Sequence, residues 1–469
     1  MRRTLLTSAL FLAACQTPNP TSTDAGATVD APAQDVTPGD DVSAPADGGA
    51  DGRDRLDYQP EGCMHRVHTS EGTTGNFRGD STTFGAAPTP QGVHVTWPAD
   101  PSSNIAVLWR TDADTRASVV QIGTSMTTLD RTVVGHVSIG GTGPNAAPIH
   151  EVHICGLTPD TTYYYRVGGE GHWSGVQTFK TAPAPGRTDY DVNFAVTGDS
   201  RDNPVVFNEV QQALLRASGM RQPDFQIFSG DAVFLGQIQG SWNQWFENGA
   251  PTMGRMPFML AHGNHDGLAI NYLVQFAQPQ ADAQDQDELY FSLDYGPIHF
   301  VVLNDTPRGG DLSSLAGQQL TWLRADLTRA RMNRARVPFI VAVHHKPCFG
   351  SSVHSAATDT EFIRRTWPPV YNEYGVDLVL SGHEHDFEVS KELDGEGREV
   401  SGARGTTYVV AAGAGAQLYE ARSRTWTRYS ESVVNFLLVH ATNSVLEVTP
   451  HRGDGTVITQ GRVSLTPRM

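Results

Sequence analysis

Five short blocks of the sequence contain side chains that bind metal ions or move protons, and in four of them glycine comes first. Each block follows an apolar run, such as residues 376–380 before the histidines at 383 and 385. Imidazole is the commonest metal-binding side chain, and carboxylates supply hard oxygen ligands. The pattern therefore predicts a metal site. The blocks are Gly198-Asp199, Gly230-Asp231, Gly263-Asn264-His265-Asp266, His344-His345 and Gly382-His383-Glu384-His385.

The elements that carry these blocks are predicted by the pattern of residues 188–469. Apolar runs alternate there with helical segments such as "FNEVQQALLRA" and "LAGQQLTWLRADLTRARM", which indicates a layered α/β sandwich. Closing strands are expected near the C-terminal end. Ligand sites of open α/β sheets lie beyond the carboxyl ends of the strands, so we expect the five blocks to meet there. Glycine before a ligand suits a crowded turn.

Residues 85–183 differ, because they contain about seven short strands separated by turns, which predicts an all-β sandwich. The stretch "GLTPDTTYYYRVG" resembles the Leu-x-Pro-x-Thr-x-Tyr corner of fibronectin type III domains, with Leu157, Pro159, Thr161 and Tyr163 in those places. The domain looks like the one that precedes the catalytic domain of purple acid phosphatases. We expect it to be a spacer or adhesion module without chemistry of its own.

The five blocks resemble those of the calcineurin-like metallophosphoesterase superfamily over residues 188–420. The resemblance implies a layered α/β/β/α sandwich that holds two divalent metal ions. Asp231 would bridge the ions, and Asp199 and His385 would bind the first one. The implied ligands of the second ion are Asn264, His383 and one histidine of the fourth block.

The fourth block offers two candidates for that ligand. His345 fits the His-x-Pro continuation of the family, whereas His344 keeps a Val-x-x-His register and stays the alternative. The purple branch of the family also has a substrate-facing histidine about nine residues further on, and His354 occupies that place when the count starts from His345. The prediction is therefore His345.

The expected chemistry is hydrolysis of a phosphate ester. Two ions about 3.5–4 Å apart can clamp the attacking and leaving oxygens, and a hydroxide bridging the metals would be the nucleophile. The residue types suit Zn, Mn or Fe. A departing alkoxide needs a proton, for which His265, oriented by Asp266, is the first candidate and His354 the second. Arg201 and Lys346 flank the blocks and are candidates for holding phosphate oxygens.

Two positions depart from the family pattern. Most members have Asp-x-His in the first block, where this chain has Asp199-Ser200-Arg201. The purple acid phosphatases instead have a tyrosine ligand three residues after the bridging aspartate, and Phe234 stands there. Beyond Asp199, Asp231 and His385, the sequence indicates no further protein ligand for the first ion, which leaves the identity of the metal open.

The N-terminal end predicts export. Residues 1–15 contain two arginines, an apolar stretch and the sequence Leu12-Ala13-Ala14-Cys15, which resembles a bacterial lipobox. We therefore expect an exported bacterial lipoprotein, anchored to a membrane at Cys15 and facing the periplasm or the cell surface. An ordinary signal peptide with a chance cysteine is the alternative.

Residues 16–57 are predicted to be a disordered, acidic, Pro/Ala/Asp-rich linker. Their nine Asp and two Arg contribute −7 to the net charge of −17. Because the acidity describes a tether, it indicates no particular partner, and nucleic-acid binding is not expected. With Cys15 lipidated, Cys63, Cys155 and Cys348 leave at most one disulfide, whose pair the sequence does not fix.

The predicted function is that of a dinuclear metal-dependent phosphomonoesterase acting on a small phosphate ester. The alternatives are a phosphodiesterase acting on nucleotides or phospholipid headgroups, because the same metals serve both reactions, and a surface-binding lipoprotein with a vestigial metal site. Retention of candidate site residues favours an enzyme over the last alternative. These residues are Asp199, Asp231, Asn264, His265, His383 and His385.

Overall fold

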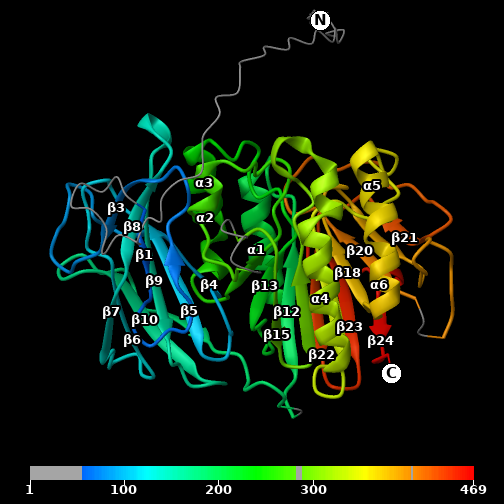
Figure 1. Ribbon diagram of the computed structural model, residues 1–469, viewed down its shortest axis with the longest axis horizontal. Coiled ribbons are helices and arrows are strands. Elements are labelled where there is room, and N and C mark those ends of the chain that lie inside the picture. The colour runs from blue at the N-terminus through cyan, green and yellow to red at the C-terminus, as the bar shows by residue number, and fades with distance from the viewer. Residues whose placement is uncertain (1–54, 188, 281–287, 403–404, 469) are drawn as a thin grey trace, which may run out of the picture. The chain divides into compact units, whose positions relative to one another are not determined.

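An all-β sandwich forms the N-terminal part, coloured blue to cyan in Figure 1. The computed structural model describes residues 55–187, 189–280, 288–402 and 405–468. A four-stranded sheet in the order β11-β10-β6-β7 packs on strands in the order β4-β5-β9-β8-β3. These strands are β3 (Thr74–Arg78), β4 (Gln91–Thr96), β5 (Asn104–Arg110), β6 (Val119–Gly123), β7 (Arg131–Val134), β8 (His136–Gly140), β9 (Ala147–Cys155), β10 (Thr162–Gly168) and β11 (Gln177–Lys180).

The segment before residue 85 adds structure that the sequence pattern did not predict. Strands β1 (Asp57–Tyr58) and β2 (Val67–His68) pair with each other, and β3 joins the edge of the sandwich beside β8. A disulfide between Cys63 and Cys155 ties this segment to the end of β9, across 92 residues of sequence. Cys348 is a buried free thiol.

The C-terminal part is a layered α/β/β/α sandwich, as predicted. One layer contains β24-β23-β22-β12-β13-β14, which continues into the first part through β4, and the other contains β15-β16-β17-β18-β20-β19-β21. The strands of the first layer are β12 (Val192–Thr197), β13 (Phe225–Phe228), β14 (Phe258–Leu260), β22 (Asn435–Ala441), β23 (Leu446–Arg452) and β24 (Val463–Leu465). Those of the second are β15 (Phe291–Tyr295), β16 (Ile298–Val302), β17 (Phe339–Val343), β18 (Leu378–Ser381), β19 (Phe387–Ser390), β20 (Thr407–Ala411) and β21 (Thr427–Glu431).

Helices cover the outer faces of the two layers. On the first layer, apolar faces of α1 (Pro204–Ser218) and α2 (Gln239–Met253) pack on buried side chains of β13 and β14. On the second layer, α4 (Gln318–Met332), α5 (Thr358–Thr366) and α6 (Pro368–Tyr374) pack in the same way (Figure 1). Among the described residues, no helix has the length and apolar character that a membrane span requires.

Aromatic side chains fill the space between the two layers. Phe194 of β12 stacks on Phe225 of β13 with ring centroids 5.1 Å apart, and Phe300 of β16 meets both rings edge-on. All three are fully buried, and each such side chain contributes about 1.5–3 kcal/mol by leaving water. This packing fixes one sheet against the other, so that strand ends from both sheets keep a constant separation.

The direction of the strands explains how the five blocks meet. β12, β13 and β14 run parallel, as do β16, β17, β18 and β20. The blocks at 199, 231 and 264 therefore leave the same edge of the first layer, and those at 345 and 383–385 leave one edge of the second. Asp199, Asp231 and His383 take the left-handed conformation, with φ of 54°, 56° and 68°, directly beyond their strands. Such backbone in non-glycine residues is uncommon and clusters at functional sites.

A buried histidine joins α4 to the hairpin of β15 and β16. His299 lies 2.7 Å from Asp294 and 2.8 Å from Asp326, one carboxylate on each ring nitrogen. Burial alone would lower the pKa of His299, but the two carboxylates outweigh it and raise this pKa from 6.5 to about 9.

We expect His299 to make stability depend on pH. Because its pKa is raised in the folded state, its contribution is complete below pH 6.5 and disappears as the pH rises through 9. The contribution is at most roughly 3 kcal/mol. Urea unfolding of the wild-type and His299→Gln proteins should differ by most of this amount at low pH and converge at high pH. A difference that does not change with pH would contradict the assignment of a charged His299.

Candidate metal centre

Two groups of metal-binding side chains meet between the layers and share one carboxylate. The first contains Asp199, Asp231 and His385, and the second contains Asp231, His345 and His383. Within each group the donor atoms lie within 4.8 Å of one another, and all five residues are buried. The structure therefore brings four of the five predicted blocks to one place, with Asp231 in the central position.

The remaining block, the third in the chain, contributes Asn264, which follows β14. Its amide oxygen lies 3.1 Å from Nε2 of His345, on the side of the second group. A carbonyl oxygen at this position is a hard donor beside two imidazoles and a carboxylate, which suits the divalent ions that accept mixed nitrogen and oxygen ligands.

Glycines allow the strand ends to approach this closely. A Cβ on Gly230 would lie 2.5 Å from the ring of His345, and one on Gly382 would lie 2.4 Å from Oδ2 of Asp199. Any larger residue would therefore push a metal-binding side chain out of place. The sequence pattern of glycine directly before the ligand has a steric cause at both positions.

Backbone carbonyls fix the orientation of two imidazoles. Nδ1 of His345 lies 2.8 Å from the Ser229 carbonyl, and Nδ1 of His385 lies 2.7 Å from the Gln417 carbonyl. A carbonyl only accepts hydrogen bonds, so each Nδ1 carries the hydrogen. The lone pair of Nε2 is then free to bind a cation, which is the usual arrangement behind a metal-binding histidine.

The structure separates the two histidines of the fourth block. His345 turns into the site, where Nε2 lies 3.4 Å from Asp231. His344 turns to the opposite face of the layer, 3.4 Å from Asp305 and against the rings of Trp367 and Tyr371. Alternation of side chains at the strand end explains the difference, and it favours the predicted ligand over its alternative.

The charge of the site favours bound cations. Asp199 and Asp231 are both buried, and burial disfavours the charged form of a carboxylate, which raises the pKa of Asp199 well above its usual value. Burial alone would lower the pKa of His345, but the carboxylates of Asp231 and Asp199 raise it to about 10. Burial lowers the pKa of His385 to about 4. The donor set therefore attracts positive charge and fits two divalent ions.

Arg201 lies at the edge of the first group. Its Nε lies 3.5 Å from Oδ2 of Asp231, and its Nη2 lies 3.5 Å from Nε2 of His385. The guanidinium also lies over the ring of Phe234, at 5.3 Å, and bonds Asp202 at 2.9 Å. Phe234, which occupies the place of the tyrosine ligand in the purple branch, is half exposed and lacks a donor atom.

The prediction that Asp266 orients His265 is wrong. The buried carboxylate of Asp266 accepts hydrogen bonds from the backbone N–H groups of Asp231, Ala232, Val233 and Gly263, at 2.8–3.3 Å. It therefore shapes the turn that presents Asp231. The ring of His265 instead donates from Nδ1 to the carbonyl of Phe234 at 2.9 Å. Hydrogen bonds between a side chain and the backbone cannot be recognised from the sequence pattern.

Lys346 and His354 have partners that the sequence did not indicate. Lys346 was a candidate for holding phosphate oxygens. Its ammonium group instead donates to the carboxylate of Asp359 at 2.6 Å, which balances its charge. His354 packs 4.4 Å from the ring of His383, and its Nδ1 lies 3.4 Å from the fully buried carboxylate of Glu384. The structure therefore places the carboxylate of Glu384 beside the ring of His354, whereas the ring of His265 contacts the Phe234 carbonyl.

Tyr419 is a neighbour of the site that sequence reasoning missed. Its ring stacks on His385, with centroids 4.1 Å apart and planes inclined by 16°, and it lies 5.4 Å from His354. The residue follows β20, which ends at the same sheet edge as the other blocks. Its position after a strand of the same sheet edge could have indicated Tyr419. The loop lacks a glycine followed by a metal-binding residue, which is the pattern that marked the other blocks.

Comparison with known proteins agrees with this architecture. Residues 90–181 match the model of the purple acid phosphatase N-terminal domain, and residues 192–387 match that of the calcineurin-like phosphoesterases. Purple acid phosphatase 23 of Arabidopsis thaliana is 29% identical over 268 residues, which are 51% of this chain and 57% of that protein. Human acid phosphatase type 7 is 28% identical over 322 residues, covering 64% and 70% of the two chains.

A solved structure shows the same fold. The purple acid phosphatase from yellow lupin (Lupinus luteus) seeds superposes with a TM-score of 0.63 at 18% identity, covering 81% of this chain and 74% of that one. Residues 192–387 therefore form a calcineurin-like phosphoesterase domain. The match of residues 90–181 and the similar proteins relate the chain to the purple acid phosphatases.

We expect the two neighbouring histidines to differ in their effect on bound metal. His345→Ala removes a donor from the second group and should lower metal content by about one ion per chain. His344→Ala leaves both groups intact and should keep the wild-type content, although it opens a cavity beside Trp367. Elemental analysis after dialysis measures both. Equal losses in the two variants, or loss in His344→Ala alone, would contradict the placement of His345.

Proposed function

We propose that the protein hydrolyses phosphate monoesters with the help of two divalent metal ions. The observation that carries this proposal is the position of Asp231, which belongs to both donor groups. One ion would be held by Asp199, Asp231 and His385. The other would be held by Asp231 together with Asn264, His345 and His383. When bound, such a pair supplies Lewis acidity at the phosphoryl group and activates water at neutral pH.

Arg201 is suited to hold the phosphate. Its guanidinium reaches the edge of the first donor group and offers several N–H donors in one plane, which match the oxygens of a phosphoryl group. The contact with the Phe234 ring restricts the side chain to this position. A fixed donor array lowers the entropy that is lost when substrate is bound and oriented.

His354 is suited to protonate the leaving group. The carboxylate of Glu384 lies 3.4 Å from its Nδ1, and contact with the His383 ring keeps His354 next to the donor groups, where a positioned imidazole can transfer a proton. The His354 side chain is about one-third exposed, so a substrate can reach it. The ring of His265 donates to the carbonyl of Phe234, and His265 is the second candidate.

The preference for monoesters is supported by relatives that are named purple acid phosphatase 23 and acid phosphatase type 7, and by the match of residues 90–181 to the purple acid phosphatase N-terminal domain. One experiment separates this proposal from the diesterase and surface-binding alternatives. Purified protein is incubated with Zn²⁺, Mn²⁺ or Fe²⁺ and assayed on an alkyl phosphate, an aryl phosphate and a bis-aryl phosphate.

We expect faster hydrolysis of the monoesters than of the diester. His354→Ala should reduce the rate on the alkyl phosphate by about 10²-fold or more, because an alkoxide needs a proton to leave. It should reduce the rate on p-nitrophenyl phosphate much less, because that leaving group is stable as an anion. His172→Ala, which changes an exposed histidine of the sandwich, is the matched control. Faster diester hydrolysis would replace the proposal, and no hydrolysis with any metal would refute it.

We further propose that the protein is an exported lipoprotein anchored at Cys15. Residues 1–54, which include the predicted signal and most of the predicted linker, lie outside the described residues, so the support comes from the sequence and from the Cys63–Cys155 disulfide. Disulfides persist in oxidising, exported compartments.

Membrane fractionation tests the proposal. The Cys15→Ser substitution removes the site of the lipid anchor and should move the protein to the soluble fraction. A Cys15→Ser protein that stays in the membrane fraction would contradict the proposal.

A further inference from the structure

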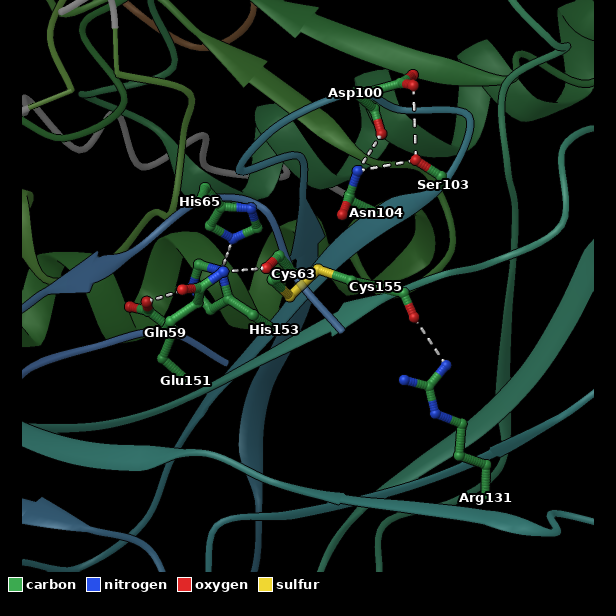
Figure 2. Close-up of a disulfide and its surroundings, with 10 residues drawn as sticks. All are labelled: Gln59, Cys63, His65, Asp100, Ser103, Asn104, Arg131, Glu151, His153 and Cys155. Carbon is green, nitrogen blue, oxygen red and sulfur yellow. Dashed lines mark hydrogen bonds and ion pairs between the residues drawn. A yellow bond between two sulfur atoms is a disulfide. The ribbon is translucent and has the colours of Figure 1, made fainter. Parts of the chain in front are cut away.

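The N-terminal sandwich contains a second cluster of metal-binding side chains, far in sequence from the phosphoesterase blocks. The sulfur atoms of Cys63 and Cys155 and a ring nitrogen of His65 lie within 4.8 Å of one another. Figure 2 shows His65 beside the disulfide and above His153. Nothing in the proposed hydrolysis uses these residues, so their proximity calls for a separate explanation.

The sequence around the two cysteines is symmetric. Cys63-Met64-His65 is a Cys-x-His unit, and His153-Ile154-Cys155 is a His-x-Cys unit. Residues two apart on a strand point to the same face, so β9 presents His153 and Cys155 together. Nδ1 of His153 lies 2.8 Å from Nε2 of His65. The two sulfurs and His65 thus form one cluster, and His153 adjoins it through its contact with His65.

Glu151 fixes the orientation of His153. Its carboxylate lies 2.6 Å from Nε2 of His153, so that nitrogen carries the hydrogen and Nδ1 presents its lone pair towards His65. A carboxylate behind a histidine is the arrangement that orients imidazole ligands of zinc and raises their basicity. Cys63, Cys155 and His153 are each at most 5% exposed, which protects the cluster from competing water.

The positions of the cysteines do not depend on the disulfide alone. Gln59 donates to the Cys63 carbonyl at 2.6 Å, and the Cys63 N–H donates to Pro60 at 3.1 Å. Arg131 donates to the Cys155 carbonyl at 2.9 Å, and Cys155 pairs with Asn104 of β5 (Figure 2). When the disulfide is reduced, these backbone contacts keep the two thiols next to the imidazoles.

We propose that the reduced protein binds one Zn²⁺ through Cys63, His65, His153 and Cys155. Two thiolates and two imidazoles form a tetrahedral donor set typical of structural zinc. A dithiol reductant would open the disulfide, giving two thiols and its own disulfide, and binding of Zn²⁺ would then release two protons. The disulfide and the metal exclude each other, because sulfurs bonded to one another are not thiolate ligands.

A cavity gives an ion access to this site. Its volume is about 560 Å³, and its lining includes His65, His153 and Glu151 together with His68 and His136. An ion that enters the cavity therefore reaches the imidazoles of His65 and His153. The site is independent of the proposed phosphatase activity, and its test does not require turnover.

Cobalt provides a direct test, because Co²⁺ bound to thiolate gives an intense near-ultraviolet charge-transfer band that carboxylate and imidazole ligands do not give. The phosphoesterase donor groups contain no cysteine, so cobalt bound there does not contribute to the band. Full-length protein without a histidine tag is reduced with a phosphine, freed of metal and titrated with Co²⁺. We expect the band to saturate at one ion per chain and to disappear on addition of Zn²⁺.

Variants and controls separate the four ligands. Cys63→Ser and Cys155→Ser should each remove most of the band, and His65→Ala or His153→Ala should weaken cobalt binding by at least about 10-fold. Cys348→Ala, which removes the remaining buried thiol, is the matched control and should leave the band unchanged. The oxidised protein should show no band. A reduced protein without the band, or unchanged affinity in both histidine variants, would overturn the proposal.

Thermal unfolding provides a second test that remains valid if reduction of the disulfide destabilises the protein. Zn²⁺ should raise the melting temperature of reduced wild-type protein more than that of reduced His65→Ala or His153→Ala, because a ligand of the folded state stabilises it. Zinc bound at the phosphoesterase groups contributes equally to all three. An equal rise in all three proteins would mean that the sandwich holds no zinc.

Discussion

The structure depends on one electrostatic constraint, which is the burial of the Asp231 carboxylate close to that of Asp199. Two carboxylates without water around them require nearby positive charge. His345 and Arg201 supply some of it, at 3.4 and 3.5 Å from Asp231. Asp231 belongs to both donor groups, so two cations would balance the buried negative charge. The strand ends of both layers meet at this point and bring the other donor side chains to it. Fold and chemistry are therefore linked through one side chain.

Much of this arrangement was predictable from the sequence. Apolar runs that end in glycine and a ligand mark the carboxyl ends of parallel strands, and parallel strands place those ends at one edge. The amphipathic helix in "LAGQQLTWLRADLTRARM" appears as α4, and the predicted α/β/β/α layers are present. The choice of His345 over His344 relied on the His-x-Pro continuation of the family, because the apolar pattern alone does not show how the strand end turns.

The features that were missed are those made by contacts remote in sequence. Strands β1 and β2 have two residues each, which is too short for any periodicity, and the partner of Cys63 lies 92 residues away. Asp266 looked like a partner of His265 because the two are adjacent, yet it binds four backbone N–H groups. Tyr419 enters the site from a loop without a motif. The Cys-x-His and His-x-Cys units became meaningful once the structure placed them together.

The most direct test of the account is the metal content of Asp199→Ala and Asp231→Ala, measured on disulfide-bonded protein by elemental analysis. The account predicts two ions in the wild type, one in Asp199→Ala, and neither in Asp231→Ala, because two cations without their shared carboxylate repel each other across a short distance. Full retention of one ion in Asp231→Ala, with the fold intact by circular dichroism, would contradict the bridging role of Asp231.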